Sequence, residues 1–198
     1  MAGFIIGCFG KQRSGKTLIA YKTAKSIKEA INSAGQEIRV YTNLYCPADI
    51  DFIYINNVDD LPLDLEPKIV LIDEIYNGLD AQDYRSLKEV SIYLNTLGKQ
   101  NCLFIFTSIE EGMVYNRLRT QMNMAILVKG SPETIAYKVI DMDTLGISDY
   151  IVKKSPELFR NVNYDTNFIP VDFDWGMRSW KQKLIKFYSD HYGITVNF

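Results

Sequence analysis

The chain has 198 residues, of which 47% are hydrophobic and 23% are charged, close to the average of globular proteins. This length fits one domain with a buried core, and the composition excludes a disordered or fibrous chain. The formal net charge of −2 excludes a uniformly basic surface, so any contact with nucleic acid has to come from a local patch.

Three cysteines, Cys8, Cys46 and Cys102, lie far apart in the sequence and form no CxxC pair, and the one histidine, His191, does not complete a zinc site. We therefore expect reduced, mostly buried thiols in a cytosolic compartment. The apolar runs are much shorter than the roughly 20 residues of a transmembrane helix, so no transmembrane segment is predicted.

Strands and helices are predicted to alternate along the first half of the chain. Residues 3–9 are typical of a buried strand, and apolar side chains recur at helical spacing over 15–35. Further strands are predicted at 37–44 and 68–73, and the second is apolar throughout its middle, as in a parallel sheet covered on both faces. The segment 46–67 indicates a small strand and a loop to which we assign no function.

The second half predicts a helix over 83–97, a strand over 101–108 and a late hairpin over 124–141 at the far edge of the sheet, with a C-terminal helix over about 176–192. No function is assigned to 146–175. The expected fold is a three-layer α/β sandwich with a mainly parallel sheet. We expect one domain over 1–198, with a core over about 1–145 and an extension over about 146–198.

Residues 10–17, GKQRSGKT, match the pattern G-x-x-x-x-G-K-[ST] between the first strand and the first helix. Backbone N–H groups of such a P-loop wrap phosphates, and the helix N-terminus favours negative charge. We expect Lys16 to contact the β and γ phosphates of ATP and Thr17 to bind Mg²⁺. The alternatives are a turn that binds no nucleotide and, for Lys11 and Arg13, side chains in solvent. The predicted nucleotide contacts are Gly10, Lys11, Gln12, Arg13, Ser14, Gly15, Lys16, Thr17 and Leu18.

The apolar strand at 68–73 ends in two acids, Asp73 and Glu74. The carboxyl end of this strand is expected beside the P-loop, where a second Mg²⁺ ligand is needed, so Asp73 is assigned to the metal. Hydrolysis also needs a group that activates water, and Glu74 is the candidate base. Acids that merely end a strand are the alternative interpretation.

Other candidate groups are less specific. The strand over 101–108 ends in Thr107 and Ser108, one of which could sense the γ-phosphate, as the equivalent strand end does in motor ATPases of this layout. An arginine supplied in trans can neutralise transition-state charge, with a rate effect of about 10³–10⁵. Arg85, Arg117 and Arg119 are the candidates for this finger. Ordinary loop or surface positions remain the alternative for all five residues.

The C-terminal helix carries Arg178, Lys181, Lys183 and Lys186 with aromatic residues between them. One interpretation is a basic face that contacts DNA phosphates. The other is an amphipathic helix whose aromatic side chains are in the core and whose lysines are in water.

The segments GKQRSGKT, VYTNL, LIDE with DYRS, and FTS with NRLR together resemble the FtsK/HerA superfamily over about residues 1–130. Within it the chain is similar to the genome-packaging ATPases of membrane-containing icosahedral viruses, of the archaeal turreted icosahedral virus type, and to Zot-like assembly proteins. The segment YDTNF at 164–168 also resembles a tail of such ATPases. Zot-like proteins usually carry a later membrane segment, and its absence here favours packaging.

The resemblance implies a P-loop NTPase of the ASCE/RecA-like class that forms a ring, with a hexamer as the expected form and nucleotide bound between neighbouring subunits. It assigns Lys16 and Thr17 to phosphate and Mg²⁺, Asp73 to Mg²⁺ and Glu74 to water, and it offers the same three arginines as fingers. The family commonly has Gln or Asn where this chain has Ser108, which departs from its sensor pattern.

The predicted function is ATP hydrolysis that drives viral double-stranded DNA into a preformed capsid. The expected partners are DNA, further copies of the chain and proteins of the capsid vertex or membrane, in the host cytoplasm or at the packaging vertex of the virion. A small-molecule kinase is one alternative, although Glu74 would promote the attack of water that a kinase must suppress. A nucleotide-dependent switch or assembly protein is the other, although the chain has no guanine-reading N-K-x-D or T-K-x-D tetrad.

Overall fold

The computed structural model describes residues 3–76, 84–168 and 171–197, with the backbone alone at 84–89. The strands within these ranges are β1 (Ile5–Phe9), β2 (Arg39–Thr42), β3 (Phe52–Tyr54), β4 (Lys68–Ile72), β5 (Cys102–Ser108), β6 (Met124–Gly130), β7 (Thr134–Asp141) and β8 (Ile147–Lys153). The α-helices are α1 (Lys16–Ser33), α2 (Tyr84–Thr96), α3 (Asn116–Thr120), α4 (Pro156–Phe159) and α5 (Trp180–Tyr192).

The strands form one eight-stranded sheet in the order β3-β2-β4-β5-β1-β6-β7-β8. Pairing is parallel from β3 to β6, whereas β7 is antiparallel to both β6 and β8. Because the first six strands in this order are parallel, their carboxyl ends share one edge. The predicted mainly parallel sheet and the late hairpin are both confirmed.

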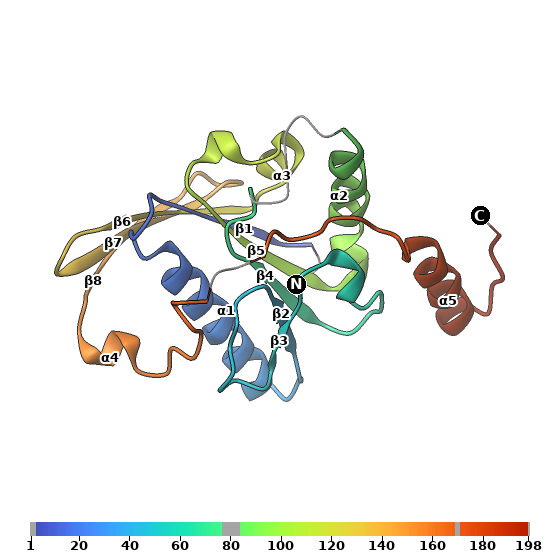
Figure 1. Ribbon diagram of the computed structural model, residues 1–198, viewed down its shortest axis with the longest axis horizontal. Coiled ribbons are helices and arrows are strands. Elements are labelled where there is room, and N and C mark those ends of the chain that lie inside the picture. The colour runs from blue at the N-terminus through green and yellow to red at the C-terminus, as the bar shows by residue number, and fades with distance from the viewer. Residues whose placement is uncertain (1–2, 77–83, 169–170, 198) are drawn as a thin grey trace.

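Helices cover both faces of the parallel part of the sheet, with α1 on one side and α2 and α3 on the other (Figure 1). Both faces need a cover because successive side chains of a strand point to opposite faces, as those of β1 do. Ile5 and Phe9 pack in the core beneath α2 and α3, whereas Ile6 and Cys8 pack in the core beneath α1. The three-layer sandwich is therefore confirmed.

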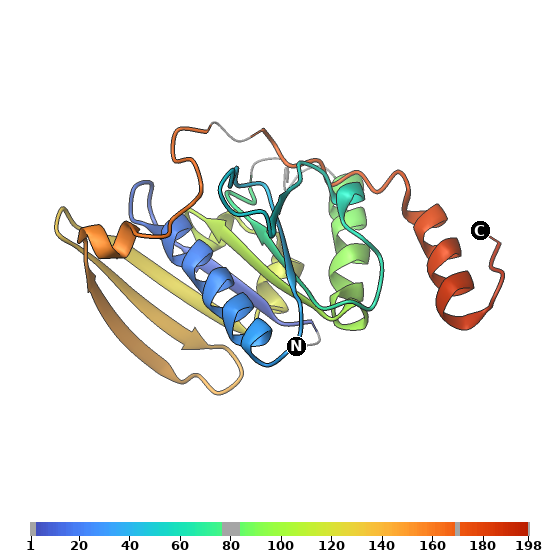
Figure 2. The ribbon, with the colours of Figure 1, turned by 90° about the horizontal axis from the view of Figure 1, so that it is seen from below.

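Two parts of the C-terminal third differ from expectation. Strand β8 was not predicted, and it takes the sheet edge that was assigned to the hairpin. It pairs along β7, so the sheet continues past the expected core boundary near residue 145. Helix α5 begins at Trp180, later than predicted, and has no fully buried residue. Trp180 is partly buried and packs against the core beneath α2 and α3, so the interpretation that placed aromatic side chains of this helix in the core holds at its first residue and not for a buried helix. Figure 2 shows α5 standing away from the sheet.

All three cysteines are buried free thiols, and burial raises the pKa of each to about 12. Among the described residues, no helix combines the length and apolar character needed to cross a bilayer.

Candidate nucleotide site

The groups expected to bind nucleotide meet at the shared carboxyl edge of β1, β2, β4 and β5. The P-loop follows β1, Asn43 follows β2, Asp73 follows β4, and Thr107 lies at the end of β5. Parallel pairing of β1 with β5 and of β5 with β4 sets these ends side by side. This is the edge at which open α/β sheets bind their ligands.

The P-loop is held close to β6 and β7 by its glycines. A Cβ on Gly10 would lie 2.5 Å from the carbonyl oxygen of Val128, and one on Gly15, where φ is 94°, would lie 2.7 Å from Cδ1 of Ile135. Glycine is favoured at Gly10 because a side chain would collide with the backbone of β6, and at Gly15 because its positive φ strains any other residue. The Ser14 hydroxyl is buried without a hydrogen-bond partner inside this loop, so the loop has a polar group to offer a bound anion.

The two predicted metal ligands are already in contact. The Thr17 hydroxyl donates to Oδ1 of Asp73 at 2.9 Å, and the Thr107 hydroxyl donates to the same oxygen at 2.6 Å. Burial raises the pKa of Asp73, while the bonds from Thr107 and Thr17 and the charge of Lys16 oppose that rise. A buried carboxylate in this setting gains from a divalent cation beside it.

Asn43 fixes the backbone of Asp73 from the neighbouring strand. The Asp73 N–H donates to Oδ1 of Asn43 at 2.7 Å, and Nδ2 of Asn43 donates to the Asp73 carbonyl at 2.9 Å. Because one amide side chain satisfies both backbone groups, the position of the Asp73 main chain is set by β2 as well as by β4.

Glu74 occupies a strained backbone position beside the P-loop lysine. Its φ of 51° lies in the left-handed region, which non-glycine residues rarely adopt outside functional sites. The Glu74 N–H donates to the Thr107 hydroxyl at 2.9 Å, and the Ile75 N–H donates to the Thr107 carbonyl at 3.0 Å, which together hold the turn. Oε1 of Glu74 lies 3.6 Å from Nζ of Lys16, whose side chain is only 5% exposed.

A cavity of about 390 Å³ opens over this cluster, a size within the range of small-ligand sites. Lys16, Thr17 and Asp73 line one end of it. The residues present fit a triphosphate with Mg²⁺. For the phosphates, the loop offers the Ser14 hydroxyl, which has no hydrogen-bond partner, and the buried Lys16. For the metal, the Thr17 hydroxyl and the Asp73 carboxylate are hydrogen-bonded to each other, so both can reach one cation. Thr17 and Asp73 are the residues that would hold the metal.

Ser108, Arg117 and Arg119, the candidates for the sensor and the arginine finger, are not part of the cluster of Thr17, Asp73 and Glu74. Ser108 is fully buried, and its hydroxyl donates to the carbonyl of Glu110 in the following loop, whereas Thr107 contacts both acids of the cluster. Arg117 and Arg119 lie on α3, and the guanidinium of Arg119 donates to Asn116 at 2.9 Å. Neither arginine lines the cavity.

Arg85 lies in the first turn of α2, and its side chain is outside the described part of the structure. The roles of all three arginines and of Ser108 remain predictions.

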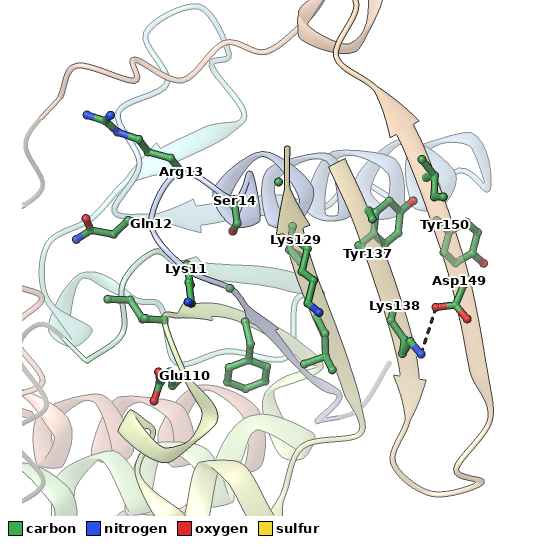
Figure 3. Close-up of a pocket in the computed structure, with 18 residues that line it drawn as sticks. Lys11, Gln12, Arg13, Ser14, Glu110, Lys129, Tyr137, Lys138, Asp149 and Tyr150 are labelled. Atoms are coloured by element: carbon green, nitrogen blue, oxygen red, sulfur yellow. Dashed lines mark ion pairs between the residues drawn. The ribbon is translucent and has the colours of Figure 1, made fainter. Parts of the chain in front are cut away.

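The outer side of the P-loop borders a separate groove of about 1080 Å³ against β6, β7 and β8 (Figure 3). Lys11, Lys129 and Lys138 line it, and Lys138 pairs with Asp149 at 3.4 Å. On β7 and β8 the rings of Tyr137 and Tyr150 are stacked, with centroids 4.9 Å apart. The remaining lining residues are Phe9, Gly10, Gln12, Arg13, Ser14, Ile109, Glu110, Leu127, Val128, Gly130, Ala136 and Ile151.

Sequence reasoning gave no role to Asn43, and it considered Thr107 only as a possible sensor. Asn43 and Thr107 are polar residues at the carboxyl end of a predicted strand, as Asp73 is. This shared position could have identified them as site residues from the sequence. Tyr164, which also lines the cavity, carries no such signal because it follows no strand.

No protein-family model and no curated protein matches the sequence. Solved structures do share the fold. The N-terminal domain of zonular occludens toxin from Neisseria meningitidis superposes with a TM-score of 0.53 at 15% identity, covering 83% of this chain and 100% of that chain. B204, the DNA-packaging ATPase from Sulfolobus turreted icosahedral virus, gives 0.54 at 9% identity, with 75% and 97% covered. The RadB recombinase gives 0.51 at 14%, with 78% and 88% covered. The predicted RecA-like P-loop NTPase fold is therefore confirmed.

Proposed function

We propose that this chain is an Mg²⁺-dependent ATPase that moves viral double-stranded DNA into a preformed capsid. The observation that carries the ATPase part is the contact of Thr17 and Asp73, with Lys16 and Glu74 beside it, at the edge of the sheet. A hydroxyl and a carboxylate so placed would hold Mg²⁺, which would supply positive charge to offset the negative charge of the phosphates.

The pair of Lys16 and Glu74 gives ATP binding a direct effect on the base. Nζ of Lys16 lies 3.6 Å from the Glu74 carboxylate, and the phosphates of ATP compete for the same ammonium group. When Lys16 contacts the phosphates, the Glu74 carboxylate loses this partner and becomes a better acceptor for the proton of an attacking water. The proposal takes water as the nucleophile, and transfer to the hydroxyl of another substrate is the alternative that the test below distinguishes.

The motor part of the proposal comes from the relatives in fold and from the resemblance of the sequence to packaging ATPases. B204 is a DNA-packaging ATPase, and its structure is similar to that of this chain over most of both lengths. We infer the same work here, by a ring of copies, with hexamers as the expected form. The ring would act in the host cytoplasm and at the packaging vertex of the virion, beside capsid or membrane proteins.

The groove beside the P-loop is the local patch that we assign to DNA. Lys11, Arg13, Lys129 and Lys138 line it against two acids, Glu110 and Asp149, on a chain whose net charge is negative. Among the described residues, neither Lys11 nor Lys129 has an ion-pair partner, so both cations are available for phosphates.

The other basic candidate, helix α5 with the residues just before it, is less suited to DNA around the start of the helix. Nζ of Lys183 donates to the carbonyls of Asp59 and Leu61, and Arg178 pairs with Asp174 at 3.0 Å. Lys183 is therefore held by the protein itself, and Arg178 already has an acidic partner at the surface.

The test is phosphate release from ATP with Mg²⁺, measured with and without double-stranded DNA. The proposal expects release that DNA accelerates and that Lys129→Gln makes less sensitive to DNA, with basal release unchanged. Lys181→Gln on α5 is the matched control, since it removes an exposed lysine outside the groove. If DNA does not change the rate of phosphate release, the result supports a nucleotide switch. If the phosphoryl group is transferred to a small molecule and no phosphate is released, the result supports a kinase. Either result would overturn the motor function.

A further inference from the structure

The cavity over the phosphate cluster has a second wall, made by a segment far away in the sequence. We call residues 154–168, which follow β8 and include α4, the strap. Lys154, Phe159, Tyr164 and Phe168 of the strap line the same cavity as Lys16 at the P-loop end. Figures 1 and 2 show the strap leaving β8 and passing beside the N-terminal half of α1.

The strap is fastened at both of its ends. At its start, the Lys154 N–H donates to the Glu133 carbonyl at 2.7 Å, and Nζ of Lys154 donates to the Ser131 carbonyl at 2.6 Å. At its end, the ring of Phe168 lies against Tyr45 and Tyr54, with centroids 5.3 and 5.8 Å away. The strap thus spans the cavity from the β6–β7 turn to the residues that follow β2.

The middle of the strap rests on α1 and on the segment after β2. Nζ of Lys25 donates to the Asn161 carbonyl at 3.3 Å, and the Asp165 N–H donates to the Tyr45 carbonyl at 2.9 Å. The ring of Tyr164 packs on that of Tyr21 on α1, with centroids 5.2 Å apart. These contacts hold Tyr164 next to the helix whose first residues bind phosphate.

Tyr164 is the strap residue with chemistry suited to the phosphate end. It lines the cavity together with Thr17 and Asp73. Burial, followed by interaction with Asp73 and Cys46, raises the pKa of Tyr164 to about 12, so its hydroxyl keeps its proton at neutral pH. A protonated phenol in the wall of this cavity is a hydrogen-bond donor available to a triphosphate bound there.

We propose that the strap is the second wall of the nucleotide site and that the Tyr164 hydroxyl binds the phosphates of a nucleoside triphosphate. This inference rests on the proposed ATPase function and adds a binding group from the C-terminal third of the chain. A nucleotide held between α1 and the strap also ties the strap to the phosphate loop. Nucleotide binding therefore protects the strap from local opening.

The first test is equilibrium binding of ATP with Mg²⁺. Tyr164→Phe keeps the ring on Tyr21 and removes only the hydroxyl, so it should weaken ATP binding about tenfold, the effect of one hydrogen bond to a charged group. Tyr150→Phe, on exposed β8, is the matched control and should bind like wild type. Binding by Tyr164→Phe within about twofold of wild type, with Lys16→Ala unable to bind, would overturn the role of Tyr164 alone. No binding by wild type would instead refute the proposed function.

The second test is trypsin cleavage after Arg160, an exposed residue in the strap, followed by mass analysis of the product that ends there. ATP with Mg²⁺ should slow this cleavage severalfold in wild type and less in Tyr164→Phe at the same nucleotide concentration. If saturating ATP leaves the cleavage rate unchanged, the strap is not part of the site. This readout does not depend on hydrolysis.

Discussion

The two walls of the nucleotide cavity are built in different ways. The sheet wall, which we define as residues 10–17 with Asp73, Glu74 and Thr107, sits at the ends of paired parallel strands. The strap crosses the surface of α1 and is held by single hydrogen bonds and ring contacts. Strand pairing positions the sheet wall before any ligand arrives, whereas contacts worth about 1 kcal/mol each leave the strap able to open locally.

This difference suggests a division of work. Groups that must meet the reacting phosphate with little reorganisation belong on the rigid wall, because catalysis depends on donors and charges that are already in place. A segment that can open suits entry and release of nucleotide. We therefore expect substitutions on the sheet wall to abolish or greatly slow turnover, and substitutions on the strap to change affinity by smaller factors.

The largest expected effect is that of Lys16→Ala. It removes a buried cation from the phosphate end and leaves Glu74 without its lysine partner, so ATP binding and hydrolysis should both be lost. Equilibrium binding and phosphate release measure the two effects. Tyr164→Ala on the strap provides the comparison: if it lost as much affinity as Lys16→Ala, the two walls would not differ as described.

The next largest effect concerns the arginine finger, a positive charge that is expected from a neighbouring subunit and not from either wall. Alanine at the true finger among Arg85, Arg117 and Arg119 should keep ATP affinity and cut turnover by about 10³. Arg85 is the first choice, because it follows the acids in a segment expected at the rim of the subunit. Mixing Arg85→Ala chains with Lys16→Ala chains should restore activity, since mixed rings place an intact P-loop beside an intact arginine.

The outcome that would contradict this prediction is the formation of mixed rings that remain inactive. If no arginine variant is rescued although mass measurements show that mixed rings assemble, the site is not shared between neighbours.

Glu74→Gln tests the chemistry of the sheet wall with little change in shape. The amide cannot take a proton from water, so turnover should fall by about 10² or more while ATP stays bound. Glu110→Gln is the matched control, because Glu110 lines the outer groove and not the cavity. Turnover by Glu74→Gln within about threefold of wild type would show that another group activates the water.

The sheet wall could be predicted from sequence because its residues are marked by strand ends. The G-x-x-x-x-G-K-[ST] pattern after one apolar run and Asp73 after another place both groups at the same edge once the strands are parallel. The spacing of residues in the sequence could not predict two features of the structure. One is the positive φ of Glu74. The other is the hydrogen bonds that Asn43 and Thr107, from neighbouring strands, make with Asp73.

The strap and α5 could not be predicted in the same way. The place of Tyr164 depends on a ring contact with Tyr21, 143 positions earlier in the chain, and no local pattern encodes such a contact. The helical spacing of α5 is real, but periodicity shows that a helix has an apolar face and not what covers it. In the structure α5 has no fully buried residue, and its first residue, Trp180, packs against the edge of the core.

The smallest expected effect on the sheet wall is that of Thr107→Val, which keeps the shape and removes one hydroxyl. That hydroxyl donates to Asp73 at 2.6 Å and accepts from the N–H of Glu74 at 2.9 Å, so both acids lose a contact that fixes them. We expect a loss of about 1–3 kcal/mol in the free energy of unfolding, because a buried N–H is left without its acceptor. Mg²⁺-dependent ATP binding should weaken by about tenfold, since Asp73 is less well oriented. Thr107→Ser keeps the hydroxyl and should retain most of the binding, as denaturant unfolding and ATP titration would show. If valine and serine gave the same binding, the ring of hydrogen bonds around Asp73 would have no part in holding the metal, and the rigidity attributed to the sheet wall would rest on strand pairing alone.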